Sequence, residues 1–298
     1  MSTDKMLETK RKAADAAMKE GDKLTTKTLL RWKLDWDTAA IQYEKAANGY
    51  RTTKAYDLAK YCFKRLSTCQ KHADVFYLAA KSMEGASSMA REQNNVAESA
   101  DLLIEASKLY RTNGNSFAAA DAMTKAAKML EDTDLKKALE LLHDSCELFE
   151  LDDKEHFSGD TFKLTISMLL KHKMYSETLE LLLAQNRVFV KLDNTHDLHK
   201  SCLGAIVINL SIDDLVSAKR RYEDFLIYPS FIHSQEGTNA LELIYAFEKN
   251  DGEAVKKITS RPLFNFLDNQ IAKIAKKLAV CDSAVGGKGA TENEESVL

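Results

Sequence analysis

The chain has 298 residues, of which 45% are hydrophobic and 29% are charged. Its 42 basic side chains nearly balance 45 acidic ones, which excludes the basic excess of a nucleic-acid-binding protein, so any charge-driven partner must meet a local patch. Only 2 prolines and 11 glycines leave little room for turn-rich β structure, and the abundance of Ala, Leu, Lys and Glu predicts an all-α protein.

The first 24 residues predict one amphipathic helix that closes near Gly21 and lacks the apolar core of a signal peptide. No run approaches the ~20 apolar residues of a membrane span, so we expect membrane contact only from the surface. The loop of residues 25–35 interleaves large apolar residues with Arg31 and Lys33, a pattern typical of the lipid headgroup boundary. The candidate membrane-contacting residues are Leu29, Leu30 and Trp32.

The end of this loop has a second interpretation. In a hydrophobic staple, Leu34 or Trp36 packs onto the helix that Asp35 or Asp37 caps. We favour the staple for Trp36, and both interpretations can hold because they use different residues.

From Asp37 onward the chain repeats a pattern of small and large apolar residues at offsets of 0, 3, 6 and 10, which lie on one face of a helix. The first anchors of the four copies are separated by 60, 39 and 40 residues, so the period is about 40 and the half period of about 20 is one helix plus a turn. The four copies are Ala40, Tyr43, Ala46 and Tyr50; Ala100, Leu103, Ala106 and Tyr110; Leu139, Leu142, Ser145 and Phe149; and Leu179, Leu182, Gln185 and Phe189.

Further helical patterns fill the intervals, and polar junctions such as Asn113-Gly114-Asn115 separate them. These helices are expected at 56–69, 73–92, 115–130, 157–172 and 197–210. Antiparallel helix pairs stacked in one direction form a right-handed solenoid or twisted sheet, similar to tetratricopeptide repeats but with longer helices.

The period is lost after Asp214, where shorter and more apolar helices predict a C-terminal helical bundle. We therefore expect a helical-repeat array at 1–228, the bundle at 229–281, and a flexible acidic tail at 282–298.

Motifs for catalysis, cofactors or metals are weak. The segment GGKGAT at 286–291 lacks the glycine spacing and preceding strand of a phosphate-binding loop, and His196 and His199 lack further metal ligands, so a surface turn explains them better. We expect no enzyme, no cofactor and no small-molecule substrate. The five cysteines form no C-x-x-C pair, and the four in helical patterns are predicted to be buried reduced thiols of a cytosolic protein: Cys62, Cys69, Cys146 and Cys202.

Basic residues recur from one helical pair to the next. A solvated face explains any single cluster, but the recurrence indicates that some of these residues line one groove that meets an acidic, rod-shaped partner. The candidate groove residues are Lys60, Lys64, Lys125, Lys128, Lys171 and Lys173, and nearby clusters contain Arg65, Lys136, Lys137, Lys219, Arg220 and Arg221. Acidic residues gather late in the chain, at Glu248, Asp251 and Glu253 and in the tail.

Two segments resemble the gamma type of the soluble NSF attachment protein (SNAP) family. They are LLRWKLDWDTAAIQYEKAANGYR at 29–51 and SRPLFNFLDNQIAKI at 260–274. The intervening repeat register also fits, so the resemblance covers about residues 6–280.

The resemblance implies an adaptor in membrane fusion and vesicle transport. Its basic concave face would coat the SNARE four-helix complex, and its C-terminal end would recruit the hexameric ATPase NSF for ATP-driven disassembly. It places Leu29, Leu30 and Trp32 in a membrane-dipping loop and Glu248, Asp251, Glu253 and Leu298 toward NSF. The expected location is cytoplasmic, peripheral to vesicle, Golgi and ER membranes.

Two alternatives remain open at this stage. One is a generic tetratricopeptide-like scaffold that binds a peptide or helical partner through a compact clamp of two carboxylate-binding sites. The other is an enzyme on a helical-repeat fold, such as a prenyltransferase subunit, which requires a deep pocket with a metal or a nucleophile.

Overall fold

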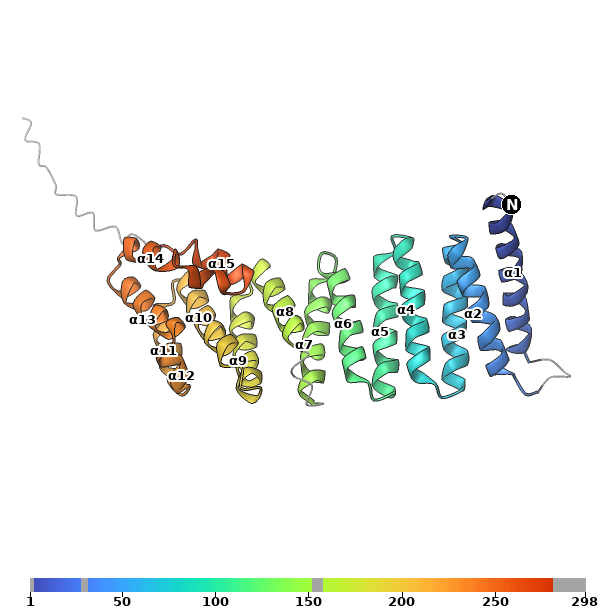
Figure 1. Cartoon of the computed structure of the whole chain (residues 1–298), viewed down its shortest axis with the longest axis horizontal. Coiled ribbons are helices and arrows are strands. Elements are labelled where there is room, and N and C mark those ends of the chain that lie inside the picture. The colour runs from blue at the N-terminus through green and yellow to red at the C-terminus, as the bar shows by residue number, and fades with distance from the viewer. Residues whose placement is uncertain (1–2, 28–31, 152–157, 281–298) are drawn as a thin grey trace, which may run out of the picture. The chain divides into compact units, whose positions relative to one another are not determined.

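The structure, a computed structural model, describes residues 3–27, 32–151 and 158–280. Every regular element in those ranges is a helix, which confirms the predicted all-α fold (Figure 1). The chain divides into two compact units, Met1–Met168 and Leu169–Leu298, and each is described by itself. The predicted domain boundary at 228/229 stays a prediction.

The first unit is a row of long helices in which each helix packs beside the next one in the chain (Figure 1). Most of them have 17 residues and start at intervals of about 20, in agreement with the predicted half period. The helices are α1 (Thr3–Leu24), α2 (Trp36–Thr52), α3 (Tyr56–His72), α4 (Phe76–Glu92), α5 (Val96–Thr112), α6 (Ser116–Leu130) and α7 (Leu135–Leu151), and α8 (Gly159–Lys171) runs across the division between the units.

A three-residue turn of constant geometry produces this regular spacing. In these turns the middle residue has a positive φ, and the third residue donates its N–H to a carbonyl five residues earlier, as Asn95 does to Ala90 at 3.0 Å. Asn95 then caps the following helix, since its side chain accepts a hydrogen bond from the N–H of Glu98. The positive-φ residues of these turns are Lys54, Asp74, Asn94 and Gly114 in the first unit and Lys173, Asp193, Asp213 and Asn250 in the second. The α6–α7 connection differs, since Asp134 donates its N–H to Leu130, four residues earlier, at 2.7 Å.

Alternate helices in the first unit also touch, so the row has two layers. The Lys60 ammonium of α3 lies 2.7 Å from Glu98 of α5, and Lys137 of α7 lies 2.9 Å from Asp101 of α5. On the other side, Lys125 of α6 lies 4.0 Å from Glu84 of α4. We call α3, α5 and α7 the odd layer and α4 and α6 the even layer.

The predicted repeat positions form much of the core. Nearly all are buried, and the large tyrosines at the end of the pattern, Tyr50 and Tyr110, are completely buried. Ala40, Leu139 and Phe189 are only half-buried. The alanines between the anchors let neighbouring helices approach closely, and burial of these faces stabilises helices that could not hide their apolar stripes alone.

The second unit is built around one central helix. Helix α10 packs against α9, α11, α12, α13 and α15, and its residues from Ser201 to Leu210 are all buried. Gly204 lets α15 approach, because a Cβ there would lie 2.9 Å from the Ile271 side chain. The elements are α9 (Tyr175–Lys191), α10 (Thr195–Ser211), α11 (Leu215–Phe225), α12 (Pro229–Ile232), α13 (Gln235–Glu248), α14 (Gly252–Thr259), the 3-10 helix η2 (Pro262–Phe266) and α15 (Asn269–Ala275).

Candidate functional site

The candidate membrane loop is anchored at its base by a polar cluster. Tyr43 of α2 donates a hydrogen bond to Asp22 at 2.7 Å and lies 3.0 Å from the hydroxyl of Thr25, the first residue after α1. Arg65 of α3 donates to both Tyr43 and Thr25, at 3.1 and 2.7 Å. Burial raises the pKa of Tyr43 to about 12, so its hydroxyl stays protonated and can hold Asp22 throughout the physiological range.

Trp32 is 85% exposed, as a membrane-contacting side chain would have to be. Leu29 and Leu30 lie outside the described residues. Trp36 packs against the core and stacks on His72 with ring centroids 3.9 Å apart, while Asp35 accepts the hydrogen bond from the N–H of Thr38 that caps α2. The predicted cap at Asp35 is therefore present, but Trp36 is the first residue of α2 and its ring packs on α3, so the staple predicted for Trp36 is wrong.

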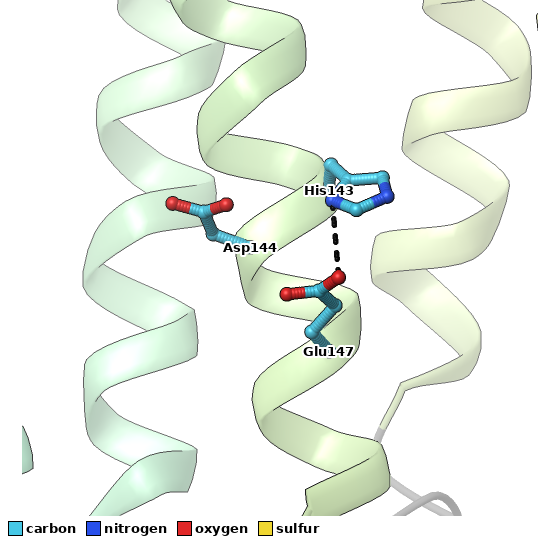
Figure 2. Close-up of side chains that lie close together, drawn as sticks. All are labelled: His143, Asp144 and Glu147. Atoms are coloured by element: carbon cyan, nitrogen blue, oxygen red, sulfur yellow. Dashed lines mark ion pairs between the residues drawn. The ribbon is translucent and has the colours of Figure 1, made fainter.

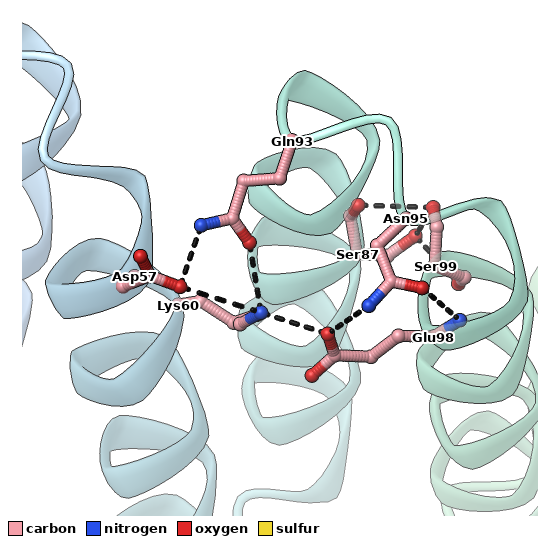
Figure 3. A network of polar contacts seen from close by, with 7 residues as sticks. All are labelled: Asp57, Lys60, Ser87, Gln93, Asn95, Glu98 and Ser99. Atoms are coloured by element: carbon pink, nitrogen blue, oxygen red, sulfur yellow. Dashed lines mark hydrogen bonds and ion pairs between the residues drawn. The ribbon is translucent and has the colours of Figure 1, made fainter.

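Lys60 belongs to the framework of the fold. Its side chain is only 15% exposed, and its ammonium donates to Gln93 at 2.8 Å and to Glu98 at 2.7 Å (Figure 3). Gln93 in turn donates to Asp57 at 2.6 Å, so the network ties α3 to the turn between α4 and α5. The Lys60 ammonium is thus engaged within the fold, and its place in a partner-binding groove stays a prediction.

The other candidate lysines of the first unit are exposed but lie in different layers. Lys64 is on α3 in the odd layer, whereas Lys125 and Lys128 are on α6 in the even layer. Lys125 is paired with Asp121 at 2.5 Å, but Lys64 and Lys128 form no ion pair with any described residue. The structure thus brings Lys125 and Lys128 together and places Lys64 on a different layer.

Lys171 and Lys173 belong to the second unit, at the end of α8 and in the turn that follows it. Both side chains are exposed, and Lys173 is the positive-φ residue of the turn, with φ of 58°. Lys173 therefore sits at a turn apex, where a partner can approach it.

The three candidate acidic residues gather at the turn between α13 and α14. Glu248 ends α13, Asp251 caps α14 by accepting from the N–H of Ala254 at 2.9 Å, and Glu253 lies in the first turn of α14. All three are exposed, although Glu248 pairs with Lys219 of α11 at 2.7 Å. We call these three residues the acidic turn. The remaining candidate, Leu298, lies outside the described residues.

One group among the described residues has side chains spaced as metal ligands, and it was not predicted. His143, Asp144 and Glu147 share a turn of α7, and all three are exposed (Figure 2). The His143 ring lies 3.6 Å from Glu147, an ordinary i,i+4 contact on a solvated helix face. His199, which the sequence analysis considered, instead contacts the Ser230 hydroxyl at 2.9 Å, and burial lowers its pKa.

The helical cysteines Cys62, Cys69, Cys146 and Cys202 are all buried, as predicted. Burial raises the pKa of Cys62 to about 12 and that of Cys69 to about 11, which suppresses the reactive thiolate. Within the described ranges, none of the helices is both long enough and apolar enough to cross a bilayer.

Sequence reasoning missed the polar cluster at the loop base. Arg65 was grouped with Lys60 and Lys64 because the three are close in sequence, yet its partner Thr25 lies 40 residues away. A local pattern carries no signal for such a contact.

Comparison with known proteins gives a consistent result. The family model described as "Soluble NSF attachment protein, SNAP" matches residues 12–266. A gamma-soluble NSF attachment protein of Dictyostelium discoideum is 64% identical over 93% of this chain and 86% of its own length. One of Arabidopsis thaliana is 33% identical over 90% of this chain and 92% of its own length.

Solved structures are less similar. BtubC from P. vanneervenii matches with a TM-score of 0.39 at 12% identity, covering 76% of this chain and 92% of its own. A signal-transduction ATPase with a tetratricopeptide repeat sensor from Pyrococcus horikoshii gives 0.41, also at 12% identity, over 84% of this chain and 39% of its own. The family model and the two relatives span most of the chain, so it belongs to the soluble NSF attachment protein family.

Proposed function

We propose that this protein is an adaptor in intracellular membrane fusion and vesicle transport. It binds assembled SNARE complexes and recruits the NSF ATPase, which then disassembles them with the energy of ATP hydrolysis. The observation that carries the proposal is the 64% identity to a gamma-soluble NSF attachment protein over 93% of the chain. Its place of action is the cytoplasm, at the surface of vesicle, Golgi and ER membranes.

The SNARE contact in the first unit is assigned to Lys125 and Lys128. Both are exposed on the same helix, and Lys128 forms no ion pair with a described residue. Lys173 contributes from a turn apex in the second unit, and Lys171 lies beside it. Charge on an exposed surface chiefly steers association and sets specificity, so these contacts weaken with salt.

The NSF contact is assigned to the acidic turn and to Leu298 in the tail. Glu253 is its most accessible charge, because Glu248 is shared with Lys219 and Asp251 is engaged as a cap. The membrane contact is assigned to Leu29, Leu30 and Trp32. Burial of a large apolar side chain contributes only about 1.5 to 3 kcal/mol, which permits reversible attachment.

Reconstitution tests the function as a whole. Purified protein, NSF and ATP are added to a preformed SNARE complex, and disassembly is followed over time. Disassembly that requires all three components supports the proposal, and a complex that stays intact refutes it.

Charge-neutral variants test the SNARE surface. Lys125→Gln/Lys128→Gln should weaken SNARE-complex binding about tenfold, because it removes two adjacent cations without adding repulsion near Glu84. The matched control Lys64→Gln/Lys108→Gln removes two exposed odd-layer charges and should change binding less than about twofold. Equal losses in both variants would show that net charge alone matters.

A second set of variants tests the acidic turn. Glu248→Gln/Asp251→Asn/Glu253→Gln removes three charges, yet asparagine retains the cap on α14, so the fold is preserved. NSF recruitment to the SNARE-bound adaptor should fall, whereas SNARE binding should not. Undiminished recruitment would remove the acidic turn from the proposal.

A further inference from the structure

A polar pocket lies in the second unit. Its lining residues follow the acidic turn in the sequence and include none of the residues assigned above to partners or to the membrane. It forms where α14, η2 and the end of α15 meet, and its volume is about 350 Å³. Its lining residues are Lys256, Thr259, Ser260, Asn265 and Lys276. No carboxylate is among them.

The chain around this pocket is strongly basic. Residues 254–280 contain six basic side chains and one acidic side chain, although the whole chain has a net charge of -3. Arg261 is paired with Glu242 at 2.6 Å, whereas the five lysines form no ion pair with any described residue, and all five are exposed. These are Lys256, Lys257, Lys273, Lys276 and Lys277.

The pocket's frame is rigid even though its lysines are not constrained. Asp268 caps α15, and Ile271 packs into the space that Gly204 leaves on the central helix α10. After α15 the chain returns along α14, since a Cβ on Gly252 would lie 3.3 Å from Val280. Packing therefore holds the chain so that Lys256 and Lys276 line the same pocket.

The wall hydroxyls are already used. Thr259 donates to the carbonyl of Val255 at 2.9 Å, and Ser260 donates to the carbonyl of Lys256 at 2.6 Å. The Asn265 side chain forms no hydrogen bond with a described residue, so its amide and the two lysine ammonium groups are the donors left for a ligand.

We propose that this pocket binds a phosphate ester with more than one negative charge, of the inositol phosphate class. A volume of about 350 Å³ falls in the range of small-ligand sites, and two ammonium groups from different elements match an anion with several oxygens. Lysine binds phosphate as a mobile point charge, so it needs no fixed fork geometry. The three other lysines of residues 254–280 add positive charge to the same stretch of chain, which favours the approach of such an anion.

The experiment is an isothermal titration of the full-length protein with inositol hexakisphosphate at low ionic strength. The double variant Lys256→Gln/Lys276→Gln should bind about tenfold more weakly, since both pocket cations are removed. The control Lys45→Gln/Lys108→Gln removes the same charge from exposed sites in the first unit and should change affinity less than about twofold. Circular dichroism checks that both variants are folded.

Vesicles distinguish the two sources of the phosphate. The protein is mixed with vesicles that contain phosphatidylinositol bisphosphate or an equal charge of phosphatidylserine, and the difference in bound protein is measured. If the protein prefers the phosphatidylinositol bisphosphate vesicles and the pocket variant does not, the ligand is a lipid headgroup. If the protein binds inositol hexakisphosphate in the titration but shows no preference between the vesicles, the ligand is a soluble phosphate ester.

Three results would overturn the proposal. The first is no heat of binding with the hexakisphosphate and no vesicle difference. The second is an equal loss of affinity in the pocket variant and the control. The third is tighter binding of a synthetic peptide of residues 281–298, with its acidic side chains, than of the phosphate ester at the same two lysines.

Discussion

Replacing Lys60 by methionine separates a structural lysine from a partner-binding one. Methionine keeps the apolar stem and removes the ammonium that joins Gln93 and Glu98 at 2.8 and 2.7 Å. Glu98 keeps its bond from Asn95 at 2.9 Å, so no carboxylate is left without a partner.

The magnitude follows from burial. An exposed ion pair contributes about 0 to 1 kcal/mol and a fully buried one about 3 to 5 kcal/mol when one partner is removed. With 15% and 33% of the two side chains exposed, the Lys60–Glu98 pair lies between these limits, and we expect a loss of about 1 to 2 kcal/mol in the free energy of unfolding. This corresponds to a decrease in Tm of about 2 to 8 °C for a unit of this size.

Urea and thermal unfolding, followed by circular dichroism at 222 nm, measure this loss. Lys64→Met on the same helix is the control, because its exposed ammonium has no ion pair with a described residue and should cost less than about 0.5 kcal/mol. A double-mutant cycle with Glu98→Gln isolates the coupling. The reasoning is refuted if Lys60→Met is as stable as the unmodified protein, or if it loses SNARE binding while remaining fully stable.

Three further predictions concern stability. Gly237→Ala should destabilise the second unit by at least about 1 to 3 kcal/mol in a urea titration, since the added Cβ would clash with the Phe231 carbonyl oxygen. The control Gly159→Ala meets nothing within 4 Å and should be neutral. Trp36→Ala should lower the free energy of unfolding by about 2 to 4 kcal/mol, because Trp36 packs on the core. Trp32 is 85% exposed, so Trp32→Ser should change it by less than about 0.5 kcal/mol, and similar losses in both variants would contradict this assignment. The free energy of unfolding should fall as the pH rises above about 9, because Cys62 and Cys69, with pKa values of about 12 and 11, stay protonated when folded but ionise when unfolded. Urea midpoints measured at pH 8 and pH 10.5 in reducing buffer test this, and equal midpoints would contradict it.

The helical array could be predicted because each helix repeats one local rule. The anchors at offsets 0, 3, 6 and 10 are set by helix periodicity, and the polar junctions contain the residues that cap helices. The expected helices at 56–69 and 115–130 are observed at 56–72 and 116–130. Such information is contained in short stretches of sequence.

The functional surfaces could be predicted only in part. Glu248, Asp251 and Glu253 are close in sequence, and the structure gathers them at one turn. Lys60 and Lys64 are equally close, yet one is held inside a network and the other is exposed, because the partners of Lys60 lie 33 and 38 residues away. Whether a lysine is available to a partner depends on those distant residues.

The pocket between Lys256 and Lys276 shows the same difficulty. Its two cations come from elements separated by η2, and only the return of the chain along α14 brings them together. Composition predicted an acidic C-terminal region, and this local excess of lysine was overlooked because it is averaged out over the chain.

The recurring three-residue turn makes the array modular in a specific sense. The turns at Lys54 and Asn94 have the same backbone geometry and are 40 residues apart. Excision of residues 56–95 would therefore join α2 directly to α5, and α5 would keep the antiparallel direction that α3 has relative to α2. Excision of residues 56–75 alone would remove only α3. Every later helix would then run in the opposite direction relative to α2, and its buried face would no longer meet the neighbouring helix. The array can therefore be shortened or lengthened by whole pairs of helices, but not by a single helix.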